Sequence, residues 1–232
     1  AHVGPKISHQ LWTNHVYFNA TAEKAGKKRP VIFSRCGGWG SGRYPIGFSG
    51  DAESVWSSLK HEIPFTTTGG NIGFGWWSND TGGFTGDHLT EDLYIRWFQF
   101  SALSPILRMH SMRGLREPWS YGALANTTAI RFFDLRRRLF PYIYTAMKTN
   151  SKENVPLCAP LYLCNPDDDA AYEYPEEYYF GDAFLCAPVF EPQVEAGGIR
   201  TVYFPKGLWR DWFTGEIFKG PAARRIYSPL TR

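Results

Sequence analysis

Apolar and polar positions follow two different patterns along the 232-residue chain, and the change comes near residue 177. Before it, short apolar runs bounded by Gly, Ser and Pro predict buried strands, and apolar residues at helical spacing predict helices between them. The predicted strands are 30–34, 44–48, 71–78 and 156–163, and the predicted helices are 20–26, 54–59, 91–103 and 126–148. We expect the second helix to end before Pro64, and Pro141 to kink or restart the last one. Strand–helix alternation of this kind is typical of an α/β fold.

Beyond residue 177 the predicted strands follow one another without helices between them. Apolar runs at 183–190 and 201–204 are followed by segments with the Pro and Gly chemistry of hairpin turns. The sequence therefore predicts an α/β part over 1–177 and an antiparallel β part over 178–232. Four strand–helix units make half of a closed eight-stranded barrel, which typically needs about 250 residues. The α/β part is thus either an open sheet or a piece of a larger barrel.

One glycine-rich stretch separates two charged residues that each follow a predicted strand. Arg35 comes after the first strand, and Asp51 comes after the second. Parallel α/β folds place catalytic side chains at the carboxyl ends of their strands, and glycine lets the backbone approach a ligand closely. Asp80 follows the next predicted strand and precedes two more glycines. The competing interpretation is that Asp51 is an ordinary N-cap of the helix that follows it.

Composition narrows the classes of function. Aromatic residues make up 17% of the chain, which suits either a thick core or platforms for sugar rings. The net charge of +3 and the absence of long basic runs argue against nucleic-acid binding. No apolar run approaches the length of a membrane span. The four cysteines have no zinc-ligand spacing, so we expect buried free thiols, with a disulfide as the alternative, and neither a metal nor a cofactor.

Several motifs resemble glycoside hydrolase family 31, the family of α-glucosidases and α-xylosidases. They stand in the family's order and cover most of the chain. The motifs are Phe33-Ser34-Arg35, Gly42-Arg43-Tyr44-Pro45, Gly47-Phe48-Ser49-Gly50-Asp51, Trp76-Trp77-Ser78-Asn79-Asp80-Thr81-Gly82-Gly83-Phe84, Arg108-Met109-His110, Gly181-Asp182 to Pro188-Val189, and a Pro-x-Gly-x-Trp turn at 205–209. The resemblance implies strands five to eight of a (β/α)8 barrel, followed by the start of an antiparallel β-sandwich. It also implies hydrolysis of terminal α-linked glucose or xylose with retention of configuration.

The resemblance assigns roles residue by residue. Asp51 matches the general acid/base, and Arg35 matches an arginine that hydrogen-bonds the sugar in the −1 subsite. Phe48 stands where the family often has Trp, and His110 matches a histidine that hydrogen-bonds a sugar hydroxyl. Three further residues complete the expected substrate-binding set: Trp77, Asp80 and Phe84. Phe84 falls at an apolar wall of the pocket, and the aspartate that matches Asp80 holds loops in place.

The family's nucleophile has no match in the chain. It should be an aspartate upstream of a segment like Trp12-Thr13-Asn14-His15, and none of the eleven residues before Trp12 is Asp or Glu. Recruiting Asp80 instead conflicts with the family pattern. We therefore expect a fragment of a longer enzyme that lacks its N-terminal half and is inactive alone. The alternative is a non-catalytic sugar-binding or subunit-forming protein. The sequence leaves open whether glucose or xylose is preferred, whether the reaction is hydrolysis or transglycosylation, and in which compartment the protein works.

Overall fold

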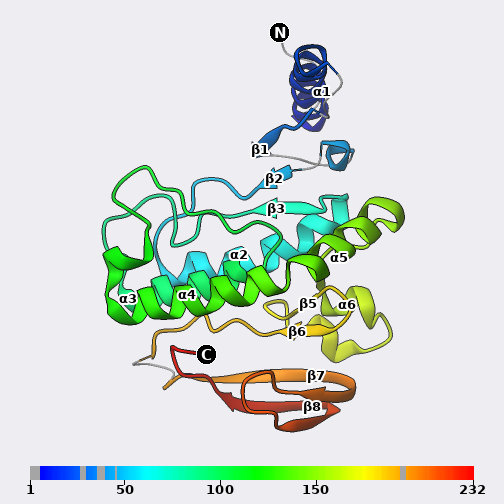
Figure 1. Cartoon of the computed structure of the whole chain (residues 1–232). Coiled ribbons are helices and arrows are strands. Elements are labelled where there is room, and N and C mark those ends of the chain that lie inside the picture. The colour runs from blue at the N-terminus through cyan, green and yellow to red at the C-terminus, as the bar shows by residue number, and fades with distance from the viewer. Residues whose placement is uncertain (1–5, 27–29, 36–39, 45, 194–196) are drawn as a thin grey trace.

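The computed structural model describes residues 6–26, 30–35, 40–44, 46–193 and 197–232. Figure 1 shows the elements in layers, from α1 and a small parallel sheet, through a middle layer of helices, to antiparallel strands at the C-terminal end. The α-helices are α1 (Lys6–Ala25), α2 (Trp56–Thr68), α3 (Glu91–Ala102), α4 (Ala123–Arg138), α5 (Phe140–Glu153) and α6 (Leu161–Cys164). Within these ranges the short 3-10 helices are η1 (Ser41–Arg43), η2 (Gly69–Ile72), η3 (Pro118–Tyr121) and η4 (Asp169–Tyr172).

Three parallel strands carry the sheet of the N-terminal part: β1 (Phe33–Arg35), β2 (Ile46–Phe48) and β3 (Trp76–Ser78), in the order β1-β2-β3. Arg35 lies opposite Phe48, and Phe48 lies opposite Ser78, so the three strand ends are level. The predicted strands at 30–34, 44–48 and 71–78 were too long. Among the described residues β1 pairs only with β2, and Phe33 is 44% exposed, so β1 is an edge strand rather than the buried strand expected.

Two helices extend further than their patterns indicated. The predicted short helix at 20–26 is the end of the 20-residue α1, which stops at Gly26 with the positive φ of 59° expected of a helix terminus. α2 was expected to end before Pro64 but continues to Thr68. Proline removes the backbone hydrogen bond to the carbonyl four residues earlier. The hydroxyls of Thr67 and Thr68 donate to the Pro64 carbonyl in the turn that follows. Packing of the buried face of α2 outweighs the local preference.

The later helices follow the sequence more closely. α3 confirms the helix predicted at 91–103. The long pattern at 126–148 is two helices, α4 and α5, which meet at Leu139. Pro141 lies in the first turn of α5, where its missing N–H costs nothing, so the predicted restart is confirmed. None of the described helices combines the length and apolar character that crossing a membrane requires.

The C-terminal part contains two antiparallel sheets. One has the order β4 (Cys158–Pro160), β5 (Tyr178–Phe180), β6 (Phe184–Cys186), and the other is the hairpin of β7 (Ile199–Arg210) and β8 (Ile217–Tyr227). The fourth strand predicted for the alternating part, 156–163, is wrong in its partner and length. Three of its residues form β4, which pairs antiparallel with β5, and residues 161–163 belong to α6. Of the four cysteines, Cys158 and Cys186 are buried free thiols as expected, Cys164 is an exposed free thiol, and Cys36 lies outside the described residues.

One hydrophobic core joins the two parts. Its buried members come from α2, α3, α5, β4, β5 and β6, and include Leu59, Ile63, Trp97, Phe100, Ile143, Leu157, Tyr178 and Phe180. Burial of side chains of this size stabilises a fold by roughly 1.5–3 kcal/mol each. The helices of this core therefore pack against the antiparallel sheet β4–β6 on one side. The parallel sheet β1–β3 lies on their other side (Figure 1).

Gly47 in β2 makes room for Trp77 of β3, its neighbour in the register. A Cβ on Gly47 would lie 2.6 Å from the Trp77 ring and 3.0 Å from the Phe74 ring. Contacts that short force the backbone or the indole to move. The absence of a side chain at residue 47 is thus a packing requirement of the sheet.

We expect Gly47→Ala to lower the free energy of unfolding by about 1–3 kcal/mol, because the added methyl group overpacks the Trp77 ring. Urea unfolding measures the change. The matched test repeats Gly47→Ala in a Trp77→Leu background, where the smaller side chain leaves room for the methyl group. Equal costs of Gly47→Ala in both backgrounds would contradict the proposed contact.

Glu62 is a buried carboxyl group in α2, only 3% exposed. Within the described part of the chain its Oε2 has no hydrogen-bond partner. Burial raises the pKa of Glu62 from 4.5 to about 7, while the Ser49 hydroxyl lowers this pKa and the Asp80 charge raises it. The folded protein therefore holds this proton more tightly than the unfolded chain does between pH 4.5 and 7.

We expect the free energy of unfolding to fall as pH rises from 4.5 to 7, because folding then keeps Glu62 protonated or buries its charge. Glu62→Gln should remove the contribution of Glu62 to this loss, while Asp80 and Glu177 keep theirs. It should raise stability at pH 8 on the order of 1–3 kcal/mol with little change at pH 4. Thermal and urea unfolding across this pH range check it. Glu153→Gln, on the exposed end of α5, is the control; parallel profiles for the parent and Glu62→Gln would refute the prediction.

Candidate active site

Two parallel strands end in Arg35 and Phe48, and the chain after β2 delivers Asp51 to the same edge. Gly50 turns the backbone between them with a φ of 99°, a conformation that glycine adopts without strain. Arg35 Nη1 lies 3.0 Å from Asp51 Oδ2, and the two side chains are 58% and 47% exposed. An ion pair this exposed is screened by water and contributes roughly 0–1 kcal/mol. A ligand with hydroxyl groups could therefore replace either partner at little cost.

The capping alternative for Asp51 is wrong. α2 begins at Trp56, its N-cap is Val55, and no side chain caps it. Asp51 contacts Arg35 instead. The carboxylate is thus a half-exposed group at a strand end, which is where α/β enzymes hold their reactive side chains.

Asp80 follows β3 and is fully buried. Its Oδ1 accepts a 2.6 Å hydrogen bond from Arg108 Nη2, and the Thr81 N–H donates to the Arg108 carbonyl at 2.9 Å. Burial raises the pKa of Asp80 to about 6; the Arg108 and His110 charges lower it, and the Asp51 charge raises it. The charges of Asp51 and His110 therefore both act on the pKa of Asp80. The Asp80 carboxylate itself faces Arg108 rather than solvent.

Phe84 and His110 stack, with ring centroids 5.3 Å apart and planes at 25°. The Phe84 N–H donates to the Ala52 carbonyl at 2.7 Å, and Ser54 N–H donates to the Thr85 carbonyl. These bonds pair the segment after Asp51 with the segment around Phe84. The ring of Phe84 and the exposed imidazole of His110 consequently lie beside the segment that follows Asp51.

Trp77 does not join these residues. Its indole is 5% exposed and packs against Phe65 of α2 at 5.2 Å and against Phe74 at 5.3 Å. The ring also lies over Gly47 and Gly69, on the face of the sheet that meets α2. Strand residues alternate between faces, so Phe48 and Ser78 point the other way. Trp77 supports the strands from behind, and the structure brings together Arg35, Phe48, Asp51, Asp80, Phe84 and His110 without it.

Sequence reasoning did not single out two arginines that hold this edge together. Arg108 pairs with Asp80, as described above, and Arg116 is 6% exposed. Arg116 Nε donates to the Gly83 carbonyl at 3.0 Å, and its Nη2 donates to the Ser54 hydroxyl at 3.2 Å. Arg108 stood inside a recognised motif, but nothing in the sequence around Arg116 indicates burial.

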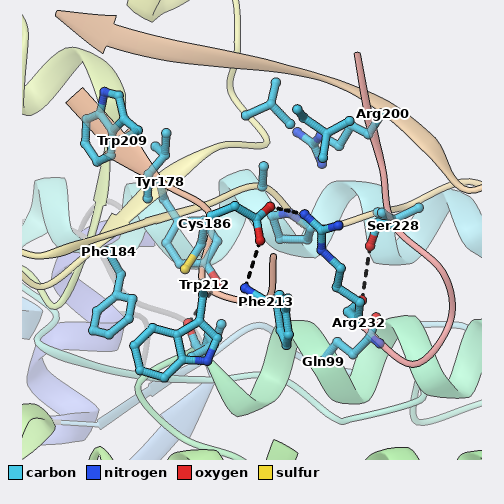
Figure 2. A pocket seen from close by; sticks show the side chains of 18 of the residues that line it. Gln99, Tyr178, Phe184, Cys186, Arg200, Trp209, Trp212, Phe213, Ser228 and Arg232 are labelled. Atoms are coloured by element: carbon cyan, nitrogen blue, oxygen red, sulfur yellow. Dashed lines mark hydrogen bonds and ion pairs between the residues drawn. The ribbon is translucent and has the colours of Figure 1, made fainter. Parts of the chain in front are cut away.

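A cavity of about 700 Å³ lies elsewhere, between α3 and strands β6–β8. Figure 2 shows it, with Phe184, Trp209 and Trp212 on its walls and Arg232 at its side. None of the residues predicted for the site lines it. Across the described ranges, no three His, Cys, Asp or Glu side chains gather in a way that could hold a metal ion.

Comparison with known proteins gives two matching family models. "Glycosyl hydrolases family 31 TIM-barrel domain" matches residues 7–146, which is more than half of the chain, and "Glycosyl hydrolase family 31 C-terminal domain" matches residues 154–231. The chain is 34% identical to "Alpha-glucosidase 2" of Bacillus thermoamyloliquefaciens over 88% of its own length and 26% of that protein. It is 33% identical to the "Alpha-xylosidase" of Saccharolobus solfataricus, over 85% of this chain and 27% of that one.

Solved structures give the same result. The chain superposes on a GH31 dextranase from Flavobacterium johnsoniae, complexed with glucose, with a TM-score of 0.89 and 27% identity, covering 96% of this chain and 28% of that one. It also superposes on a GH31 α-xylosidase from a soil metagenome, complexed with xylose, with a TM-score of 0.86 and 30% identity, over 95% and 36%. The chain spans about a quarter of the length of the curated relatives named here. It belongs to glycosyl hydrolase family 31, with sequence from both the TIM-barrel domain and the C-terminal domain.

Proposed function

We propose that the edge formed by Arg35, Phe48 and Asp51 is the acid/base side of a retaining α-glycosidase active site. The observation that carries the proposal is the 3.0 Å approach of Arg35 and Asp51, both accessible, at the ends of adjacent parallel strands in a chain of this family. The named relatives include an α-glucosidase and an α-xylosidase, which supports terminal α-linked glucose or xylose as the substrate.

The proposal includes the place of these strands in a barrel. Residues 1–177 would hold strands five to eight of a (β/α)8 barrel. β1, β2 and β3 would be strands five, six and seven, the segment at Ile106, which forms a parallel bridge with Ser78, would belong to the eighth, and the later antiparallel strands would begin a β-sandwich. The parallel pairing of β1–β3 and the antiparallel pairing of β4–β6 support this division. We keep residues 1–177 and 178–232 as the proposed parts, with β4 contributing to the second sheet from across that boundary.

Asp51 would give a proton to the departing glycosidic oxygen, because an alkoxide is too poor a leaving group without one. Its half-exposed position lets it reach a bound acetal and later take a proton from water. Arg35 would donate hydrogen bonds to sugar hydroxyls and release Asp51 as the substrate enters. Such donors orient the ring for reaction.

The remaining residues would shape the sugar pocket. His110 can donate a hydrogen bond to a hydroxyl, and the stacked Phe84 limits how its imidazole turns. Phe48, opposite Arg35 in the register, would present an apolar wall to a sugar-ring face. Asp80 would hold loops in place through Arg108 rather than touch the sugar, because its side chain is fully buried.

Retention of configuration needs a second carboxylate about 5–5.5 Å from the first, acting as the nucleophile. Asp80 is a poor candidate, since it is buried and bound to Arg108. We propose that the nucleophile lies on polypeptide outside residues 1–232, in the part of the relatives that this chain does not match. The natural partner of the chain is then the N-terminal half of a family 31 barrel.

We expect the purified 232-residue chain to show negligible hydrolysis of an activated α-glucoside, because one carboxylate cannot form and break down a glycosyl intermediate. Release of the leaving group, followed by absorbance, measures this. Turnover by the chain that Asp51→Asn abolishes would overturn the proposal that the nucleophile is elsewhere.

A chimera tests the role of Asp51 directly. Residues 1–232 would replace the matching segment of Alpha-glucosidase 2 from Bacillus thermoamyloliquefaciens, which supplies the rest of an enzyme. We expect Asp51→Asn to lower kcat/KM of an active chimera by roughly 10²–10⁴-fold, the usual contribution of general acid–base catalysis. Asp87→Asn, an exposed aspartate, is the matched control. An active chimera in which both variants lower kcat/KM equally would contradict the catalytic role of Asp51. A chimera that binds sugar without turnover would favour a non-catalytic sugar-binding protein.

A further inference from the structure

The guanidinium of Arg108 packs against two phenylalanine rings that touch each other. Its central carbon is 4.8 Å from the ring centroid of Phe33 and 4.7 Å from that of Phe48. The two rings also meet edge to face, with centroids 5.5 Å apart. Phe33 belongs to β1 and Phe48 to β2, so one side chain from the loop after α3 contacts both strands.

The same guanidinium holds the carboxylate after β3. Arg108 Nη2 donates to Asp80 Oδ1 at 2.6 Å, and the Arg108 side chain is 28% exposed while Asp80 is buried. Within the described part of the chain neither Arg108 Nε nor Asp80 Oδ2 has a further hydrogen-bond partner. The pair and the two rings therefore fix the position of the guanidinium.

The geometry needs arginine and not merely a positive charge. A planar guanidinium can lie over aromatic rings and donate to a carboxylate in its plane at the same time. A guanidinium over an aromatic ring is attracted by the negative face of that ring. A lysine ammonium could pair with Asp80 but would lack the flat surface that keeps both rings in place.

We propose that Arg108 is a positioning residue for the sugar site, which sets the orientation of Phe48 through this contact and fixes the loop that carries His110. The role inferred for Arg108 in sugar binding rests on the proposed function. The contact of Arg108 with the two rings does not depend on it. Phe48 lies opposite Arg35 in the register, and His110 is two residues from Arg108. A Phe48 ring that rotated freely would present no fixed wall to a sugar.

An alternative is that Arg108 matters only as the counter-charge of Asp80. The two interpretations differ for Arg108→Lys. A counter-charge role is satisfied by lysine, whereas positioning of Phe48 requires the planar group. Arg108→Met removes both contributions, and Arg113→Met, an exposed arginine in the same loop region, is the matched control.

Nuclear magnetic resonance of the 232-residue chain separates these roles without any glycosidase activity. The readouts are the Phe48 ring resonances, the Arg108 Nε–Hε signal, and the titration of the Asp80 side-chain carboxyl. The charged and titratable groups that act on Asp80 are Arg108, His110, Asp51 and Glu62. In the parent we expect Asp80 to titrate near its raised pKa of about 6 and Arg108 Hε to show an upfield ring-current shift.

We expect both Arg108→Lys and Arg108→Met to change the chemical shifts of the Phe48 ring. In both variants the ring should also flip faster, so that the signals of its two edges merge. Only Arg108→Met should raise the pKa of Asp80 further, since it alone removes the positive charge. Arg113→Met should change neither readout. Phe48 signals that are the same in the parent and Arg108→Lys would overturn the positioning role and leave the counter-charge role.

A second variant keeps the test decisive if Arg108→Met does not fold. Phe33 is 44% exposed, so Phe33→Leu is expected to leave the fold intact while removing one of the two rings. We expect it to reduce the ring-current shift of Arg108 Hε and to move the Phe48 ring signals, with the Asp80 titration unchanged. Phe140→Leu, 65% exposed on α5, is its control. Unchanged Arg108 and Phe48 signals would refute the contact even if the chimera described above proves to be an active glycosidase.

Discussion

The buried ion pair of Asp80 and Arg108 is the interaction on which the candidate site depends. A fully buried carboxylate is costly unless it is paired, and Arg108 is its one charged hydrogen-bond partner among the described residues. The pair ties the end of β3 to the loop that leads to His110, and its guanidinium reaches the rings of β1 and β2. All three parallel strands and a long loop thus meet at one side chain, and the accessible Arg35–Asp51 pair lies at the edge where the strands end.

The site also requires support from behind the sheet. Trp77 fills the space between β2 and α2, and only glycine at residue 47 leaves room for it. The strands have three residues each, so their backbone hydrogen bonds alone could not fix the strand ends. Dense packing against α2, and of α2 against the shared core, supplies the rigidity that a catalytic edge needs. Function at the exposed face is therefore coupled to packing on the opposite face.

The Phe33–Arg108–Phe48 contact also explains how a pocket can retain an ordered wall next to an edge strand. Phe33 and Phe48 are both partly exposed. A partly exposed ring can rotate unless a neighbouring group packs against it. A charged group packed against both rings orders them without burying either. The arrangement leaves the ring of Phe48 accessible to a ligand while limiting its motion, which suits recognition of a flat sugar face.

The sequence by itself determined the family, the order of the strands and helices up to α5, and most residues at the candidate site, because these are carried by local patterns and motif spacing. Asp51 and Arg35 could be found this way, since each directly follows a strand signal. Only the tertiary structure decided that Trp77 faces α2, that α2 continues through Pro64 and that β4 pairs with β5. Those outcomes depend on which elements pack together, and packing energy outweighs local preference wherever a large apolar surface is buried. The role of Arg108 belongs to the same class, because its partners Phe33, Phe48 and Asp80 are far from it in the sequence and meet only when the strands are aligned.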